Sequence, residues 1–400
     1  MRSERSKERE KGLYLTIHFL RVTDCFTALM SISITGNFDG GNPKDPERIH
    51  RRAPNAFTVE PYSEDGDPNY KFRLEIRVYN SSSYNEKLKL MVDWQEIAYQ
   101  RFRDYVYTKH ESEIDWHYRS GITKGSLSFF DIDILPGETY ISMHPKYGYE
   151  NYLRLTQSMP TNGSISKQMI GKTPEGREFW LIRIGSTGDN EPKSKKRILL
   201  VARIHPYETA GSYCIEGIID YFTNINSPLT FHHSPLTFHH SQFTIHNSPF
   251  TIYLIPMANP DGVYNGLCKK TGADGIDLSK QVDESDPTCR LLKRAIDTVR
   301  PHIYCEIHNW MHKNTDGIYF MGRRHAARFT ASMPSQEQYG KNWKIFLRKR
   351  FFAIKPHGFK LYCKQRFGSI CASVEYPWFG RTVRDMKQLG IDTLNALSIL

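Results

Sequence analysis

The chain has 400 residues, of which 39% are hydrophobic and 13% aromatic, enough for two or three domains with cores of ordinary size, so wholesale disorder is excluded. The 54 lysines and arginines outnumber the 43 acidic residues, and the net charge of +11 favours an acidic partner or substrate. No apolar run approaches the roughly 18 residues of a membrane-spanning helix. We therefore expect a soluble protein that has no membrane partner.

The cysteines and the N-terminal residues indicate in which cellular compartment the protein is expected. The seven cysteines are widely spaced and include no C-x-x-C pair, which predicts neither a disulfide framework nor a thiolate zinc site. Residues 1–29 mix both charge signs and lack the clean apolar centre of a secretory signal. We expect a cytoplasmic protein whose first 29 residues are an unstructured extension.

Residues 30–149 alternate with period two. Runs such as KFRLEIRVY, KLKLMVDW and SLSFFDIDI are separated by turn clusters such as EDGDPN and LPGE. This pattern predicts an all-β antiparallel sandwich domain. In the first run the apolar and the charged residues occupy opposite faces of the strand, namely Phe72, Leu74, Ile76 and Val78 against Arg73, Glu75 and Arg77.

After a connector, residues 150–400 alternate short apolar runs with segments of helical periodicity. Such alternation predicts an α/β domain with a largely buried sheet. The expected buried strands are 197–204, 250–257 and 303–308, and the expected helices are 209–222, 288–299 and 381–399.

A tandem repeat interrupts this second domain. Four seven-residue units, SPLTFHH, SPLTFHH, SQFTIHN and SPFTIYL, follow one another over 227–254, and the insert itself spans about 227–247. Because the insert contains several histidines, a metal-binding loop is one interpretation. We favour a duplicated surface loop, because the insert joins a helix end to the start of a strand, whereas α/β sheets bind ligands at the other edge.

Three polar groups follow strand ends in the second domain. His205 and Glu208 form an H-x-x-E after the strand 197–204, and His308 ends the strand 303–308. Two histidines, one glutamate and an open position are a ligand set for catalytic zinc. Glu375 ends a further apolar run, ASVEY, and is a candidate general base. Taken singly, each has an ordinary structural alternative, such as a core histidine or a buried ion pair.

The ordered set of motifs ARIHPYET, MANPDGVYNG, GIDLS, EIH and SVEY resembles the zinc metallocarboxypeptidases, and the preceding β-sandwich resembles their cytosolic carboxypeptidase subgroup. The resemblance covers residues 30–400 and implies a mixed sheet flanked by helices and one zinc ion per chain. It implies that the zinc ligands are His205, Glu208 and His308 and that the general base is Glu375. Arg203 is then a candidate to assist zinc in stabilising the oxyanion.

The sequence departs from the family in the substrate clamp. Where members have an arginine after N-P-D-G and an Asn-Arg pair after an aspartate, this chain has Lys269 and Lys270, and then Ser279 and Lys280. Positive charge is kept but the two-pronged guanidinium is lost. The choice between Lys269 and Lys270 stays open. The family's mobile tyrosine has only two candidates, Tyr362 and Tyr376.

Three functions are compatible with these residues. The first is a zinc metallocarboxypeptidase that removes C-terminal residues, with acidic ones favoured, from a peptide or protein tail. The second is a zinc amidohydrolase or deacylase acting on a small N-acyl amino acid or another amide. The third is a non-catalytic binder of acidic tails, which the intact ligand set and base argue against. Because the basic segment KSKKR lacks interleaved aromatic residues, we expect no nucleic-acid partner.

Overall fold

The computed structural model describes residues 31–64, 73–95, 103–161, 164–185, 195–224, 249–310, 315–334, 343–347 and 358–400. The expected N-terminal extension, 1–29, and the repeat insert, 227–247, lie outside these ranges. Among the described residues, no helix combines the length and the apolar character needed to cross a lipid bilayer. The six cysteines within these ranges are all free and buried.

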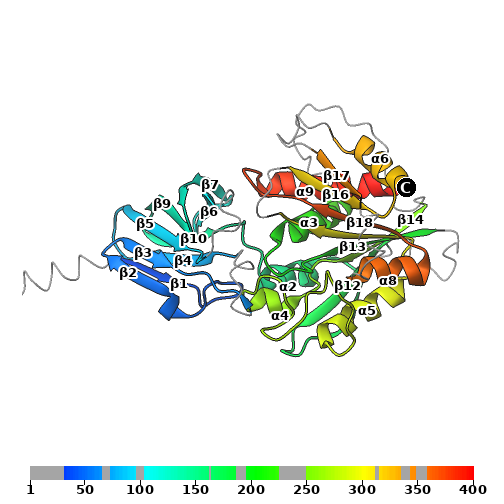
Figure 1. Cartoon of the computed structure of the whole chain (residues 1–400), viewed down its shortest axis with the longest axis horizontal. Coiled ribbons are helices and arrows are strands. Elements are labelled where there is room, and N and C mark those ends of the chain that lie inside the picture. The colour runs from blue at the N-terminus through cyan, green and yellow to red at the C-terminus, as the bar shows by residue number, and fades with distance from the viewer. Residues whose placement is uncertain are drawn as a thin grey trace, which may run out of the picture.

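The first part of the chain forms two five-stranded sheets, which Figure 1 shows together at one end of the molecule. The first sheet has the order β1 (Ile32–Thr35), β4 (Glu75–Asn80), β10 (Gly137–Ser142), β6 (Tyr105–His110) and β7 (His117–Ser120). The second has the order β2 (Ile49–Ala53), β3 (Ala56–Val59), β5 (Glu86–Asp93), β9 (Leu127–Ile134) and β8 (Ile122–Lys124).

The expected alternation is present in these sheets, but one pairing differs from the expectation. Along β9, the residues from Ser128 to Ile134 alternate strictly between buried and exposed. The pair β3 and β5 is parallel, whereas we expected antiparallel strands throughout. The cause is the chain path, because the chain crosses to β4 in the other sheet between these two strands and returns in the same direction.

The second part forms a mixed eight-stranded sheet flanked by helices (Figure 1). Its strand order is β11 (Ile165–Lys172), β12 (Glu178–Ile184), β14 (Phe250–Ile255), β13 (Lys196–Ala202), β15 (Ile303–His308), β18 (Ile370–Glu375), β16 (Asp316–Phe320) and β17 (Trp343–Leu347). The helices are α2 (Tyr149–Ser158), α3 (Thr209–Asn224), α4 (Pro260–Tyr264), α5 (Pro287–Val299), α6 (Arg323–Ser332), α8 (Gly358–Phe367) and α9 (Val383–Ser398).

The central strands are covered on both faces, which explains their continuous apolar sequences. In β13, Ile198 and Leu200 join the apolar cluster that includes α3 and α9. The alternating residues Leu199 and Val201 join the opposite cluster, which includes α5 and α8. The expected strands and helices of this domain are confirmed to within a few residues at their ends, but the expected connector contains the helix α2.

The parallel pairing of the central strands sets the position of the candidate site. β13 pairs in parallel with β15, and β15 pairs in parallel with β18. Their carboxyl ends therefore meet at one edge of the sheet. The start of β14, which follows the repeat insert, pairs with the start of β13 and so lies at the other edge. The interpretation of the insert as a surface loop stays a prediction.

Two charged residues at the start of β4 and just before it are buried where the two parts of the chain meet. Arg73 and Glu75 are only 4% and 2% exposed. Arg73 donates hydrogen bonds to the carbonyl oxygens of Pro206 (3.4 Å) and Leu267 (3.2 Å). Asp39 accepts from the first amides of α2, at 3.0 and 2.8 Å. Hydrogen bonds therefore join the two parts of the chain, and one of them reaches the turn that contains His205.

Candidate metal centre and active site

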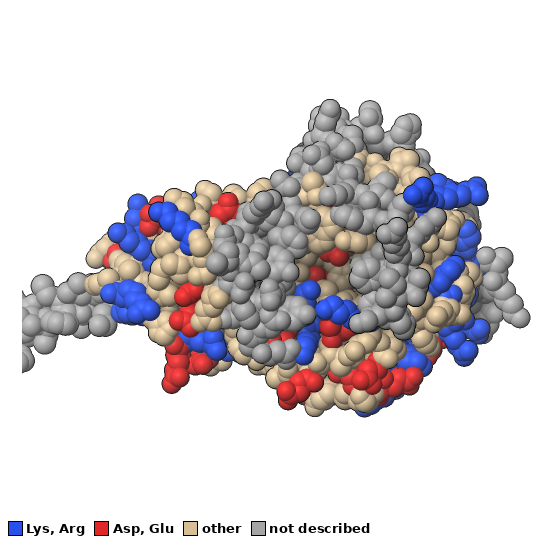
Figure 2. Space-filling model, viewed as in Figure 1, with Lys and Arg blue, Asp and Glu red and all other residues tan. Residues whose placement is uncertain are grey.

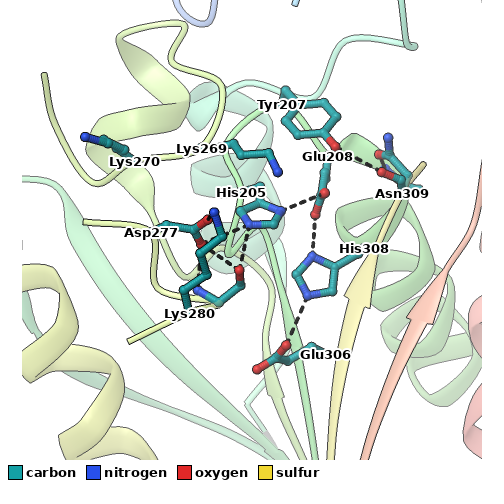
Figure 3. Close-up of polar contacts among 12 residues, drawn as sticks. His205, Tyr207, Glu208, Lys269, Lys270, Asp277, Lys280, Glu306, His308 and Asn309 are labelled. Carbon is teal, nitrogen blue, oxygen red and sulfur yellow. Dashed lines mark hydrogen bonds and ion pairs between the residues drawn. The ribbon is translucent and has the colours of Figure 1, made fainter. Parts of the chain in front are cut away.

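A single carboxylate brings two histidines together at the carboxyl edge of the sheet. His205 and Glu208 lie in the short turn between β13 and α3, and His308 is the last residue of β15. Nδ1 of His205 lies 2.8 Å from one oxygen of Glu208, and Nδ1 of His308 lies 2.6 Å from the other. Figure 3 shows both rings directed at this carboxylate.

This cluster has the donor chemistry of a metal site. The ligand atoms of His205, Glu208 and His308 lie within 4.8 Å of one another, and all three residues are buried. Burial opposes a charge on Glu208, but the two imidazoles outweigh it and hold the pKa of this carboxyl well below its usual range. Two imidazole nitrogens and an ionised carboxylate are the ligands that catalytic zinc prefers, so these residues fit a zinc ion.

The remaining ring nitrogen of His205 is also held. Its Nε2 lies 3.1 Å from Oδ1 of Asp277 and 3.1 Å from Oγ of Ser279. Although burial opposes its ionisation, His205 and the hydrogen bonds from His205 and Ser279 hold the pKa of Asp277 well below its usual range. An anionic acceptor on Nε2 fixes the ring so that Nδ1 faces the metal position.

His308 is fixed in the same manner from within its own strand. Its Nε2 lies 3.1 Å from Oε2 of Glu306, whose other oxygen accepts from the hydroxyl of Tyr304 at 3.1 Å. Lys360 of α8 forms a buried ion pair with Glu306. Tyr304, Glu306 and His308 share one face of β15 because side chains two residues apart in a strand point the same way.

Glu375 lies beside this cluster at the end of the neighbouring strand. It pairs in register with His308 across β15 and β18, so the two side chains leave the same face of the sheet. Burial raises the pKa of Glu375 to about 7, and the nearby charge of Glu208 opposes its ionisation further. A carboxyl that titrates near neutral pH can both accept and return a proton.

A family model matches the segment that carries part of this geometry. Residues 149–277, which include His205, Glu208 and Asp277, match the family model described as zinc carboxypeptidase. This part of the chain is therefore similar to zinc carboxypeptidases. Zinc is accordingly the metal that the His-Glu-His cluster fits.

Relatives and solved structures agree with this similarity. The protein is similar to cytosolic carboxypeptidase 2 of Xenopus tropicalis, with 25% identity over 270 residues, which are 62% of this chain and 26% of that relative. The chain thus matches about a quarter of the relative's length. A metallo-carboxypeptidase from Burkholderia cenocepacia shares the fold with a TM-score of 0.74 and 18% identity, covering 92% of this chain and 98% of that chain.

A second solved structure, a metallo-carboxypeptidase from Pseudomonas aeruginosa in complex with (2-guanidinoethylmercapto)succinic acid, shares the fold with a TM-score of 0.70. Its identity is 16% over 92% of this chain and 98% of that chain. At these identities the likeness concerns the fold alone.

The two lysines after α4, Lys269 and Lys270, point in different directions. Figure 3 shows the amino group of Lys269 on the side of His205 and Glu208, whereas Lys270 points away from them. The charge of Lys269 lowers the pKa of both Asp277 and Glu375. The structure therefore brings Lys269 to the site, a choice that the sequence left open.

The other expected clamp residues lie beneath or beside the zinc ligands. Ser279 donates to Oδ1 of Asp277 at 2.6 Å and thus belongs to the group that supports His205. The amino group of Lys280 lies 3.5 Å from Oδ2 of Asp277, and its side chain is 55% exposed. Lys280 therefore places a solvent-exposed positive charge at the rim of the site.

Arg203 lies two residues before His205, and its expected assistance to the oxyanion stays a prediction. It is fully buried with a positive φ of 59°, and all three guanidinium nitrogens lack a hydrogen-bond partner among the described residues. Burial lowers its pKa to about 9, with Arg73 lowering it further and Glu75 and Asp39 opposing this. The charged neighbours that shift its pKa thus come from the first part of the chain.

The hydroxyls of both candidates for the mobile tyrosine contact residues other than the zinc ligands, although the amide of Tyr376 donates to the carbonyl oxygen of His308 at 2.9 Å. The hydroxyl of Tyr376 is buried against Thr393 at 2.6 Å, and that of Tyr362 contacts Asp297 at 2.5 Å. Tyr207, which the sequence did not single out, lies between the two ligands of the turn and donates to the carbonyl oxygen of Asn309 at 3.2 Å.

Sequence analysis also missed the residues that orient the two histidines. A signal for Glu306 was present, because it lies two residues before His308 in a strand and so shares its face. Asp277 lies in the motif GIDLS, where only its neighbours were weighed as clamp residues. Lys360 had no signal, since 54 residues separate it from Glu306.

Proposed function

We propose that the protein is a zinc-dependent metallocarboxypeptidase that hydrolyses C-terminal peptide bonds. The observation that carries the proposal is the convergence of His205, Glu208 and His308 beside Glu375, in a chain of which part is similar to zinc carboxypeptidases. Each ligand and the base lies at the carboxyl end of a central strand or in the turn after it. This is the edge where sheets of this kind bind substrates.

The chemistry divides among these residues. Zinc, when bound by His205, Glu208 and His308, polarises the scissile carbonyl and lets water act as a nucleophile near neutral pH. Glu375 accepts a proton from the attacking water and returns it to the leaving amine. Its raised pKa suits both transfers, because a carboxylate of ordinary acidity would hold the proton too weakly to return it.

Lys269 is the residue that we propose for the substrate's terminal carboxylate. Its amino group lies on the side of the zinc ligands (Figure 3), and its position after α4 agrees with the clamp that the sequence motifs imply. A lysine attracts a carboxylate as a point charge rather than as a planar fork. We therefore expect a looser grip on the substrate than an arginine would give.

An acidic residue at the cleaved position is the finer part of this proposal. The overall charge gives weak support, because part of the excess lies away from the site, as Figure 2 shows for cations toward one edge of the second part. The exposed residues Arg324, Arg328 and Lys364 surround His325 there and lower its pKa, in addition to its burial. Lys280, at the rim, is the local charge that supports the preference.

The domain organisation and location belong to the same proposal. We assign residues 30–149 to a β-sandwich domain and 150–400 to the catalytic domain, which acts on the C-terminal tail of a peptide or protein. A cytosolic location is supported by the name of the Xenopus relative and by free, buried cysteines in the described ranges.

The test uses paired peptides with free and amidated C-termini and a zinc-loaded protein. We expect about one zinc per chain and cleavage of the free-acid peptides only. Glu375→Gln keeps the shape of the side chain, so zinc is retained while turnover falls at least about a hundredfold. Glu284→Gln, at a side chain 65% exposed, is the matched control and keeps wild-type turnover. Wild-type turnover in Glu375→Gln would remove the base assignment.

A second candidate is a zinc deacylase acting on a small N-acyl amino acid or another amide. It is favoured by the lysines that stand where the family has arginine, since recognition of a free C-terminus is weaker with them. The paired free-acid and amidated peptides also distinguish the carboxypeptidase from the deacylase. Cleavage that is indifferent to amidation would support the deacylase.

A further inference from the structure

Glu64 is a fully buried carboxylate that belongs to the first part of the chain, between β3 and β4. It accepts hydrogen bonds from three consecutive main-chain amides of the second part. They are the amides of Cys268 at 2.8 Å, of Lys269, and of Lys270 at 2.8 Å. These amides belong to the segment that contains the proposed carboxylate-binding lysine.

This arrangement is specific to one conformation of the segment. A buried carboxylate is costly unless its oxygens are hydrogen-bonded, and here they accept from three main-chain N–H groups of one turn. Three successive amides converge on a single anion only when the backbone curves around it. Such charge-assisted bonds are stronger than neutral ones, so they favour this curvature over others.

Other contacts from the first part hold the same segment. Arg73 donates to the carbonyl oxygen of Leu267 at 3.2 Å, and Asn42 donates to that of Gly266 at 2.9 Å. Gly266 has a φ of +73°, and a Cβ there would lie 2.1 Å from the carbonyl oxygen of Gly41. The backbone of the two parts is therefore in close approach immediately before Lys269.

The direction of the two lysines depends on this curvature. Lys269 points toward the zinc ligands and Lys270 points away (Figure 3), although they are neighbours in the chain. A different path of the backbone through residues 268–270 would redirect both side chains. The carboxylate of Glu64 accepts from the amides of Lys269 and Lys270 and so opposes such a change of path.

We propose that Glu64 is a positioning residue for substrate recognition, which fixes the amides of residues 268–270 and thereby directs Lys269 at the substrate's carboxylate. The inference rests on the proposed function for the role of Lys269. It gives the β-sheet part of the chain a share in specificity, although that part contributes none of the zinc ligands.

The first experiment compares Glu64→Gln with Glu138→Gln, the same change at a partly exposed residue of β10 that pairs with Arg77. The glutamine keeps one acceptor oxygen but turns an NH₂ group toward the amides. We expect KM for a free-acid peptide to rise about tenfold, with kcat within about threefold and zinc content unchanged. The preference for free-acid over amidated peptide should fall by the same factor, while Glu138→Gln matches the wild type.

A second measurement follows the loop without using activity. Hydrogen exchange at the amides of residues 268–270 should be faster in Glu64→Gln than in Glu138→Gln. If Glu64→Gln does not fold, Glu64→Asp, which keeps the charge but shortens the side chain, takes its place with the same expectations. Unchanged exchange in a folded variant overturns the proposal, whether or not the wild type cleaves peptides.

A double substitution tests the route through Lys269. In a Lys269→Met background, Glu64→Gln should cause no further loss of free-acid preference, because the residue that it positions is gone. A further loss there, or a fall in kcat with KM and preference unchanged, overturns the proposal. Failure of the proposed function would look different. The wild type would then cleave neither peptide, while hydrogen exchange would still show whether Glu64 fixes residues 268–270.

Discussion

The zinc-ligand cluster and the clamp segment lie side by side but are built in opposite ways. His308 and Glu375 end neighbouring strands, and His205 and Glu208 fill a turn of a few residues after a third. Side chains hold one another there, through contacts such as His205 with Asp277 and His308 with Glu306. The clamp segment 265–270 is held at its main chain, by residues from the first part of the chain and by Asn259, which donates to the carbonyl oxygen of Lys270 at 2.8 Å.

The two regions therefore have different structural requirements. Ligands at strand ends need a rigid sheet and a set of oriented rings, which the second part of the chain supplies by itself. The clamp needs a particular backbone curvature in a segment without regular structure, and residues 64 and 73 supply partners for it. Changes in the cluster should therefore act on zinc and turnover, and changes in the clamp on substrate affinity.

The largest expected effect is the loss of the ligand that joins the two histidines. Glu208→Gln removes the ionised carboxylate that contacts both rings, so we expect zinc to be lost and turnover to fall at least about a thousandfold. Zinc content and peptide hydrolysis measure this, with the exposed Glu150→Gln as control. Full zinc content in Glu208→Gln would show that the cluster is not the metal site.

The clamp should respond in substrate affinity instead. Lys269→Met removes the charge directed at the site, and we expect kcat/KM for a free-acid peptide to fall about a hundredfold with zinc retained. Lys270→Met is the neighbouring control, for which we expect less than about a threefold change. Equal effects of the two changes would contradict the directions seen in Figure 3.

A smaller effect should follow from disturbing the residue that orients His308. We expect the double change Glu306→Gln with Lys360→Met to weaken zinc affinity on the order of tenfold, because His308 loses its anionic acceptor. Competition with a chelator measures the affinity. The control is the double change Asp316→Asn with Arg381→Met, which removes another buried ion pair. Equal zinc affinity in the two double variants would assign Glu306 to stability alone.

The smallest effect concerns stability where the two parts meet. His144 is 3% exposed, and its Nδ1 lies 3.3 Å from the carbonyl oxygen of Tyr207. Burial lowers the pKa of His144 to about 4 from an ordinary 6.5. Protonation therefore favours the unfolded chain, and the stability present above pH 6.5 is lost as the pH falls toward 4.

We expect this loss to reach about 1–2 kcal/mol at pH 5. Urea unfolding at pH 7 and pH 5, with a chelator present so that metal release does not contribute, measures it. In His144→Gln the free energy of unfolding should depend less on pH by that amount. His117→Gln, at a side chain 45% exposed, should behave as the wild type. Parallel pH dependences in His144→Gln and the wild type would contradict the prediction.

The sequence predicted those strands and helices whose pattern lies within one short run of residues. The strand 303–308 has the same bounds in the structure, because six successive buried residues read as one apolar run that ends in His308. The convergence of His205, Glu208 and His308 also followed, since parallel strands end at one edge. The acceptors on their rings did not, because Asp277 is 72 residues from His205 and only the folded chain brings them together.

The clamp shows why the remainder could not be predicted. The sequence places Lys269 and Lys270 one residue apart with equal charge, and nothing local distinguishes them. Their directions depend on a backbone curvature that Glu64 stabilises from 205 and 206 residues away. A loop without periodicity carries no signal for such a partner.

By itself, the sequence determined which residues of β4 share a face, because alternation in a strand is a property of its own backbone. Leu74, Ile76 and Val78 are all fully buried on the apolar side. Only the tertiary structure decided that Arg73 and Glu75 on the opposite, charged face are buried too, whereas the side chain of Arg77 is 32% exposed. Arg73 donates a hydrogen bond to a carbonyl oxygen 194 residues away. Burial depends on what covers a face, and the covering segments are chosen by packing across the whole chain.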